Sequence, residues 1–209
     1  MSRRPQTDVA LTEHGPRAAG MLLAPGAGAG RDQPALLAID FALSQSGIVV
    51  ERMDFPYRLA GKRAPDRPPV LLASLQAEAR GLAERIGVKQ SRVALGGRSM
   101  GGRIASMTVA GGLPAAALVL VSYPLHPPGH PEKARTEHLG SIDVPCLFVS
   151  GTRDAFGTRE ELESATRAIR GSVTHFWIEG ADHGLRGRDS EVAKAVASWL
   201  RPPVKRRAR

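Results

Sequence analysis

Short apolar runs alternate with amphipathic stretches along most of the chain. The runs are typical of buried strands, and the stretches between them place apolar residues at helical spacing. Strands are expected at 20–24, 48–53, 92–96 and 115–122, with two more beginning near 144 and 173, and helices at 33–46, 69–86, 158–170 and 189–200, with another between 99 and 111. This alternation predicts an α/β fold with a doubly wound, mostly parallel sheet.

The length of the chain, 209 residues, is enough for one domain with a sizeable core. We expect that domain to cover residues 18–200. Residues 1–17 precede it as a partly flexible segment, in which 7–14 alternates enough to form an edge strand. Residues 201–209 are expected to be a flexible basic tail. The proline-rich stretch 123–140 is predicted to be irregular, which leaves the fold a minimal cap or none.

The net charge of +9 is concentrated at the two ends of the chain. Residues 1–7 and 201–209 contain no acid, and they hold seven basic residues: Arg3, Arg4, Arg201, Lys205, Arg206, Arg207 and Arg209. A basic tail of this kind binds polyanions weakly and is more often a solvated chain end. Nucleic acid is therefore not expected as a partner.

Other compositional signals are negative. No secretory signal follows Met1, and no stretch approaches the roughly 18 consecutive apolar residues of a membrane helix. The one cysteine, Cys146, falls in an expected strand and cannot form an internal disulfide. We expect a soluble cytoplasmic protein, monomeric or homodimeric, that contacts no membrane.

The strongest chemical signal is Gly97-Arg98-Ser99-Met100-Gly101, which directly follows the apolar run 92–96. A G-x-S-x-G turn between strand and helix is so tight that the residues around the serine must be small. It lifts the serine hydroxyl above the end of the strand and aims the next backbone N–H, that of Met100, at a reacting carbonyl. The motif alone is weak in a chain with 23 glycines, so its context matters.

That context comes from two later loops. Asp154 follows the strand that begins at Val144, and His183 follows the strand that begins at Val173. Both loops come after parallel strands, where catalytic groups gather. A hydroxyl needs a neighbouring base, and the base needs an orienting partner. The sequence therefore predicts Ser99 as nucleophile, His183 as general base and then general acid, and Asp154 as orienter.

Backbone donors are needed for the developing oxyanion, and we expect them to be the N–H groups of Met100 and Ala27. Ala27 lies in a loop of small residues after the strand 20–24. Further candidates for contact with substrate are Gly26, Gly28, Arg98 and Tyr123.

Each prediction has a structural alternative. Ser99 could simply occupy a tight turn, and Asp154 could start a turn or helix. Asp182 is expected to bond locally rather than to orient His183. No metal is expected because the remaining histidines lack ligand spacing. No nucleotide cofactor is expected either, because Arg31 stands where a G-x-G-x-x-G motif requires its last glycine.

Together these residues resemble the α/β-hydrolase superfamily over roughly 18–200, and within it the small, lid-poor hydrolases related to dienelactone hydrolases. Phe55-Pro56-Tyr57-Arg58 through Arg67, with Gly97 to Arg103, is similar to the testis-expressed-type hydrolase-like proteins and to a scaffold subunit of a chromatin-modifying complex. The resemblance implies the fold and the triad, and it implies no substrate. Two departures are Pro25-Gly26 where many members have His-Gly, and Ser99 where dienelactone hydrolases have cysteine.

The sequence thus predicts a serine hydrolase that cleaves a small ester or thioester through an acyl-serine intermediate, without a cofactor. Two alternatives stay open at this stage. One is a hydrolase-fold scaffold or binding protein without turnover. The other is an acyltransferase that uses the same triad with an acceptor other than water.

Overall fold

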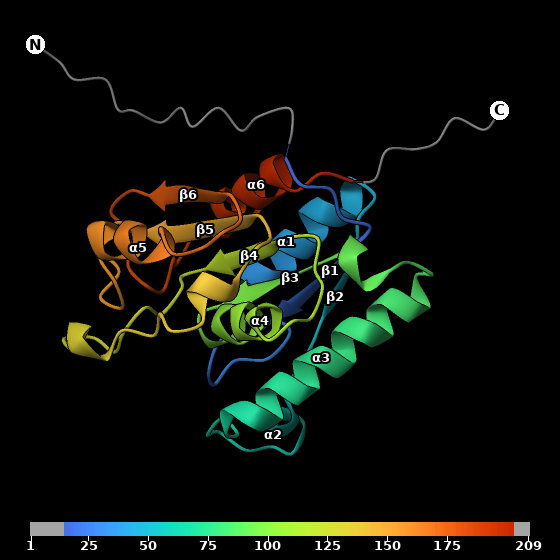
Figure 1. Ribbon diagram of the computed structural model, residues 1–209, viewed down its shortest axis with the longest axis horizontal. Coiled ribbons are helices and arrows are strands. Elements are labelled where there is room, and N and C mark those ends of the chain that lie inside the picture. The colour runs from blue at the N-terminus through green and yellow to red at the C-terminus, as the bar shows by residue number, and fades with distance from the viewer. Residues whose placement is uncertain (1–14, 203–209) are drawn as a thin grey trace, which may run out of the picture.

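The computed structural model describes residues 15–202 (Figure 1). The expected edge strand at 7–14 and the tail beyond Pro202 lie outside the described residues. The strands are β1 Gly20–Ala24, β2 Val49–Arg52, β3 Val93–Arg98, β4 Leu118–Val121, β5 Cys146–Gly151 and β6 Val173–Ile178. The α-helices are α1 Pro34–Gln45, α2 Pro56–Leu59, α3 Pro68–Arg85, α4 Met100–Ala110, α5 Arg159–Thr166 and α6 Asp189–Trp199.

All six strands form one parallel sheet in the order β2-β1-β3-β4-β5-β6. The predicted fold class, a doubly wound α/β sheet, is confirmed. The direction of winding reverses between β1 and β3, and such a switch point opens a crevice at the carboxyl ends of the strands. The register pairs Ala24 with Gly97 and Arg98 with Val121, so the ends of β1, β3 and β4 meet at that crevice.

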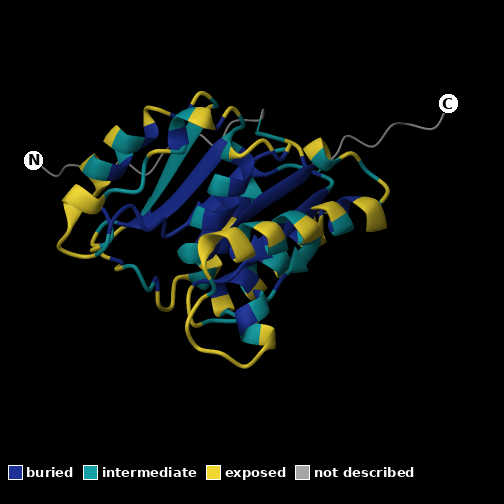
Figure 2. Cartoon of the chain, turned by 60° about the horizontal axis from the view of Figure 1, so that its bottom comes forward, coloured by how far each residue is buried: buried dark blue, intermediate teal, exposed yellow. Residues whose placement is uncertain are grey.

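Helices cover both faces of the sheet (Figure 1). One apolar cluster joins α1 and α6 to one face, through side chains such as Leu36 and Val192. A second cluster joins α3, α4 and α5 to the other face, through Leu75, Ile104 and Leu162. The central strands are therefore buried from both sides, and Figure 2 shows them in dark blue. This explains why β1, β4 and β5 are continuous apolar runs rather than alternating ones.

The stretch 54–68, expected to be only a loop, contains the one-turn helix α2. Pro56 stands at its first position, where a fixed φ favours a helix and the missing N–H costs nothing. Tyr57 anchors the turn because its side chain is buried. The stretch 123–140 is irregular as expected, apart from 3-10 turns at Pro131–Lys133 and Leu139–Ser141.

The two ends of the described chain meet. Arg17 and Arg201 form an isolated parallel bridge, in which Ala18 N–H donates to Arg201 O and Arg201 N–H donates to Pro16 O. The fold thus includes Arg17 and Arg201, which the sequence analysis had assigned to the terminal segments. Among residues 15–202, no helix is both long enough and apolar enough to cross a membrane.

Candidate active site

Ser99 stands at the sharp turn between β3 and α4. Its backbone has φ 50° and ψ −116°, which is a strained conformation for a residue other than glycine. The turn closes because its neighbours lack side chains. A Cβ on Gly97 would lie 2.1 Å from Ala24 O, and one on Gly101 would lie 2.2 Å from the same oxygen. The glycines therefore let the turn press against the end of β1, as the sequence motif requires.

Three side chains predicted from the sequence converge at this turn. The Ser99 hydroxyl lies 2.9 Å from His183 Nε2. The other ring nitrogen, Nδ1, lies 2.9 Å and 3.0 Å from the two carboxylate oxygens of Asp154. A continuous hydrogen-bonded chain thus runs from a carboxylate through an imidazole to a hydroxyl.

Asp154 is the buried end of this chain. Its side chain is 3% exposed, whereas that of His183 is 20% exposed. The carboxylate also accepts a 2.8 Å hydrogen bond from Phe156 N–H, which fixes its orientation. A buried, fixed acceptor holds the proton of the imidazole on Nδ1 and leaves Nε2 free to accept a proton from Ser99.

Phe156 is a neighbour of the site that the sequence alone did not reveal. Its ring stacks on the His183 imidazole, with centroids 4.0 Å apart and planes inclined by 28°. Because Phe156 follows Asp154 by two residues, one short loop supplies both the acid and a wall for the imidazole. An aromatic residue close after the acid was the available signal.

The loop after β1 supplies backbone N–H groups. Three of its amides already have partners: Gly26 N–H donates to Gln33 Oε1, Gly28 N–H to Tyr57 Oη, and Ala29 N–H to Gly26 O. Within residues 26–29, only the Ala27 N–H has no partner in the described part of the chain. Ala27 is also exposed. An oxyanion donor must be an N–H without a partner inside the protein, and within 26–29 the Ala27 N–H meets that condition.

The other candidate residues lie as follows. Met100 begins α4, so its N–H has no acceptor one turn earlier in the helix. Arg98 Nη2 donates to the carbonyl oxygens of His183 and Gly184. Tyr123 is 2% exposed, and its hydroxyl donates to Arg135 O. The arrangement brings the side chains of Ser99, Asp154 and His183 together, with the Met100 N–H next to Ser99. The role of Ala27 as an oxyanion donor, and the contact of Gly26, Gly28, Arg98 and Tyr123 with substrate, stay predictions.

A second polar cluster joins the stretch 123–140 to α4. His138 Nε2 lies 2.8 Å from Ser106 Oγ and 3.4 Å from Tyr123 Oη. Burial, reinforced by the positive charge of Arg103, lowers the pKa of His138 to about 4. Burial also raises the pKa of Tyr123 to about 12. Both side chains are therefore neutral near pH 7 and serve to attach this stretch.

The histidine and carboxylate side chains of residues 15–202 form no group of three able to hold a metal ion. The hydrogen bonds that link Asp154, His183 and Ser99 join protein side chains directly to one another. The chemistry that these residues support is proton transfer coupled to attack by a hydroxyl.

A parallel α/β sheet that carries a serine on a strand-to-helix turn, followed by an acid and a histidine in that order, defines the α/β hydrolases. The family comparison agrees: residues 17–201 match the alpha/beta hydrolase domain family, and the chain belongs to it. Membership supports a hydrolase activity.

Solved structures share the fold at low sequence identity. An alpha-beta serine hydrolase homologue from Coxiella burnetii has 19% identity and a TM-score of 0.69, over 88% of this chain and 86% of that one. Dienelactone hydrolase from Anabaena variabilis has 20% identity and a TM-score of 0.69, over 88% and 85%. Est1E from Butyrivibrio proteoclasticus, with ferulic acid bound, has 17% identity and a TM-score of 0.71, over 87% of each chain.

Proposed function

We propose that this protein is a serine hydrolase that cleaves a small ester or thioester through an acyl-Ser99 intermediate. The observation that carries the proposal is the continuous chain of hydrogen bonds from Asp154 through His183 to Ser99, at the end of β3. Family membership supports the class of reaction, and the low-identity structures support only the fold.

In the first step, the Ser99 hydroxyl attacks the carbonyl carbon of the substrate as its proton moves to His183 Nε2. Asp154 stabilises the imidazolium that forms and does not take the proton itself. The negative charge on the carbonyl oxygen is stabilised by the N–H groups of Met100 and Ala27. Each such donor contributes about 3–4 kcal/mol in enzymes where one has been removed.

In the second half of the reaction, His183 gives the proton to the leaving alcohol or thiol. Water then enters and attacks the acyl-serine as His183 removes its proton. The bond from the acyl carbon to Ser99 Oγ then breaks, His183 returns the proton to Oγ, and the acid is released. An acceptor other than water at this stage would make the enzyme an acyltransferase. Analysis of products with added alcohols or amines distinguishes the two reactions.

The preference for a small substrate rests on the stretch 123–140. It carries 3-10 turns and the small polar cluster around His138, rather than a separate helical cap. A site without a cap offers little apolar surface for a long acyl chain.

The deciding experiment compares hydrolysis of p-nitrophenyl acetate and butyrate by the wild type, Ser99→Ala and Ser91→Ala, with mass spectrometry after fluorophosphonate treatment. Ser91 is exposed and lies at the opposite end of β3, so its variant is the control. We expect turnover and a covalent adduct in the wild type and in Ser91→Ala, and neither in Ser99→Ala. A folded wild-type protein that stays unlabelled and inert would instead support the scaffold alternative.

A further inference from the structure

Arg98 occupies the position before the predicted nucleophile, and its half-buried side chain points to the loop that carries His183. Its Nη2 lies 2.7 Å from the carbonyl oxygen of His183 and 3.1 Å from that of Gly184. These are two consecutive carbonyls of the loop that carries the imidazole. Charge-assisted hydrogen bonds of this kind are stronger than neutral ones and fix geometry.

The guanidinium of Arg98 is held by carbonyls rather than by acids. Within residues 15–202 it forms no ion pair, and Asp154, Asp182 and Asp189 act on it only through longer-range attraction. Burial lowers the pKa of Arg98, and those three charges oppose the shift. A guanidinium stays protonated under all ordinary conditions. Placing this cation in a partly buried position is costly unless it is hydrogen-bonded, and the two loop carbonyls supply those hydrogen bonds.

On one side, the loop that Arg98 holds is attached to the Asp154 loop, because Arg153 N–H donates to Ala181 O and the His183 ring bonds Asp154. Its hydrogen bonds next to His183 on the backbone are internal, from Gly184 N–H to Asp182 Oδ1 and from Leu185 N–H to Asp182 O, so Arg98 supplies the attachment on the other side. Leu185 has φ 47°, a strained value for a branched side chain. A hollow of about 400 Å³ lies between this loop and the start of α1, lined in part by Gln33, Arg98 and Leu185. The Leu185 side chain is buried, whereas the hollow leaves this side of the loop partly open.

Arg98 also approaches the loop after β1. A Cβ built on Gly26 would lie 3.7 Å from Arg98 Nη1 and 3.6 Å from Gln33 Nε2. Gln33 is the residue that accepts the Gly26 N–H. The guanidinium therefore lies between the loop of the predicted oxyanion donor and the loop of the base, and its own backbone leads directly into Ser99.

We infer that Arg98 is a positioning residue, which holds the His183 loop at the distance from Ser99 that proton transfer requires. It acts through carbonyl contacts rather than on the substrate. This inference rests on the proposed function, because it assigns Arg98 a task in the same reaction. It replaces the role in substrate binding that the sequence suggested for Arg98 with a role in aligning the base.

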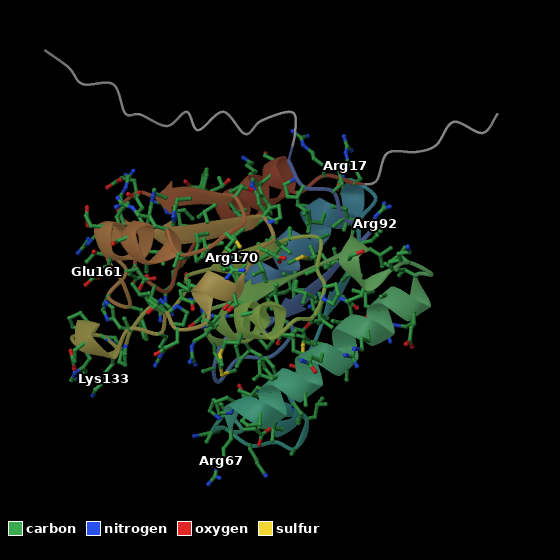
Figure 3. All side chains as sticks on the ribbon, in the orientation of Figure 1. Arg17, Arg67, Arg92, Lys133, Glu161 and Arg170 are labelled. Atoms are coloured by element: carbon green, nitrogen blue, oxygen red, sulfur yellow. The ribbon has the colours of Figure 1, made fainter. Side chains whose placement is uncertain are left out.

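The test uses Arg98→Met, which removes the donors, and Arg98→Lys, which keeps a cation and donors on a shorter, unforked group. The control is Arg92→Met. Arg92 is exposed and stands at the opposite end of β3, where Figure 3 labels it. The readouts are kcat and KM for p-nitrophenyl butyrate, the rate of fluorophosphonate labelling, and the downfield NMR signal of the His183 Nδ1 proton, which is bonded to Asp154.

We expect Arg98→Met to lower kcat and the labelling rate by roughly 10- to 100-fold, the cost typical of a small displacement of a catalytic group. KM should change little, and the downfield proton signal should shift or broaden. Arg98→Lys should restore part of the rate, and Arg92→Met should match the wild type. If Arg98→Met does not fold, Arg98→Gln and Arg98→Lys carry the same comparison.

Two results would overturn the inference. One is that the Arg98 variants are labelled as fast as the wild type and keep its proton signal unchanged. The other is a raised KM at constant kcat, seen only with an ester that carries a carboxylate, which would make Arg98 a substrate-binding group. If the wild type itself is not labelled by fluorophosphonate, the proposed function fails. The proton signal, which needs no turnover, then still decides whether Arg98 positions His183.

Discussion

At the scale of single residues, the site depends on how closely the turn at Ser99 can approach β1. The serine keeps a positive φ only because Gly97 and Gly101 have no side chain to collide with Ala24 O. The strained backbone of Ser99 is thus possible because the two glycines leave room for the turn to pack against β1. Arg98 adds a contact of a different kind, since it attaches the loop of His183 to the strand that ends before Ser99.

This close approach predicts the effect of Gly101→Ala. The new Cβ would lie 2.2 Å from Ala24 O, so β1 and α4 must separate. We expect a loss of about 1–3 kcal/mol in the free energy of unfolding, as in other overpacked sites, together with loss of labelling at Ser99. Urea unfolding and fluorophosphonate labelling measure the two effects.

Gly140→Ala is the matched control. The nearest atom to its Cβ is Ala168 O at 3.8 Å, an ordinary contact, so stability and activity should stay near those of the wild type. A Gly101→Ala variant as stable and active as Gly140→Ala would contradict the tight contact between the turn and β1.

At the scale of elements, the stretch 123–140 is attached to α4 by neutral polar side chains. His138 bonds Ser106 and Tyr123 without gaining a charge, because burial lowers its pKa from the ordinary 6.5 to about 4. The attachment is therefore sensitive to acid. In the unfolded chain His138 binds a proton at a higher pH than it does in the folded protein.

The sign of the pH effect follows from that difference. As pH falls from about 6.5 to about 4, the unfolded chain takes up the proton first, so the free energy of unfolding decreases over this window. His138→Gln removes this contribution, and its stability should fall less between pH 7 and pH 4.5 than that of the wild type. Urea unfolding at several pH values tests the prediction, and parallel curves for the two proteins would contradict it.

The elements themselves were largely predictable. Runs such as 20–24 and 173–178 lie between turn residues, so local pattern alone locates β1 and β6. The short helix α2 was missed because its stability comes from burial of Tyr57, a tertiary contact that local pattern does not carry. Its function in the fold, to place Tyr57 Oη against Gly28 N–H, depends on residues 29 positions apart.

Part of the candidate site was also predictable from the sequence. The motif around Ser99 and the chain order of Asp154 and His183 identify three side chains that the structure brings within hydrogen-bonding distance. Their catalytic roles stay a prediction until labelling is done. The sequence did not reveal the direction of the Arg98 side chain or the stacking of Phe156 on His183, because both depend on how separate loops pack.

At the scale of the whole molecule, the first and last described segments of the chain are paired through Arg17 and Arg201. Arg201 bonds residues 16 and 18 through their backbones, at the edge of the helix layer made by α1 and α6. Figure 1 shows the two described chain ends side by side. The domain is therefore fastened where chain ends would otherwise fray.

Two truncations test this closure. Ending the chain after Pro202 keeps both hydrogen bonds of Arg201, so the melting temperature should stay near that of the full chain. Ending it after Leu200 removes both, at about 0.5–1.5 kcal/mol each, and also removes the exposed hydrogen bond from Arg17 Nη1 to Pro202 O. We expect the melting temperature to fall by several degrees in the shorter form, because a domain of this size loses roughly 2–4 °C per kcal/mol. Equal melting temperatures would show that the bridge contributes nothing.

Because residues 17 and 201 are paired, the same fold could be built from a chain with a different order of segments. A short linker from residue 201 to residue 16 would make the backbone a ring, and the exposed turn at Gly129 offers a place to reopen it. A permuted gene of this kind would encode Asp154 first, then His183, and Ser99 last, although no side chain at the site would need to move. Unrelated hydrolases use different orders of the same three residue types. In this protein the chemistry would then depend on the three side chains that meet at the folded edge of the sheet, whatever their order along the chain.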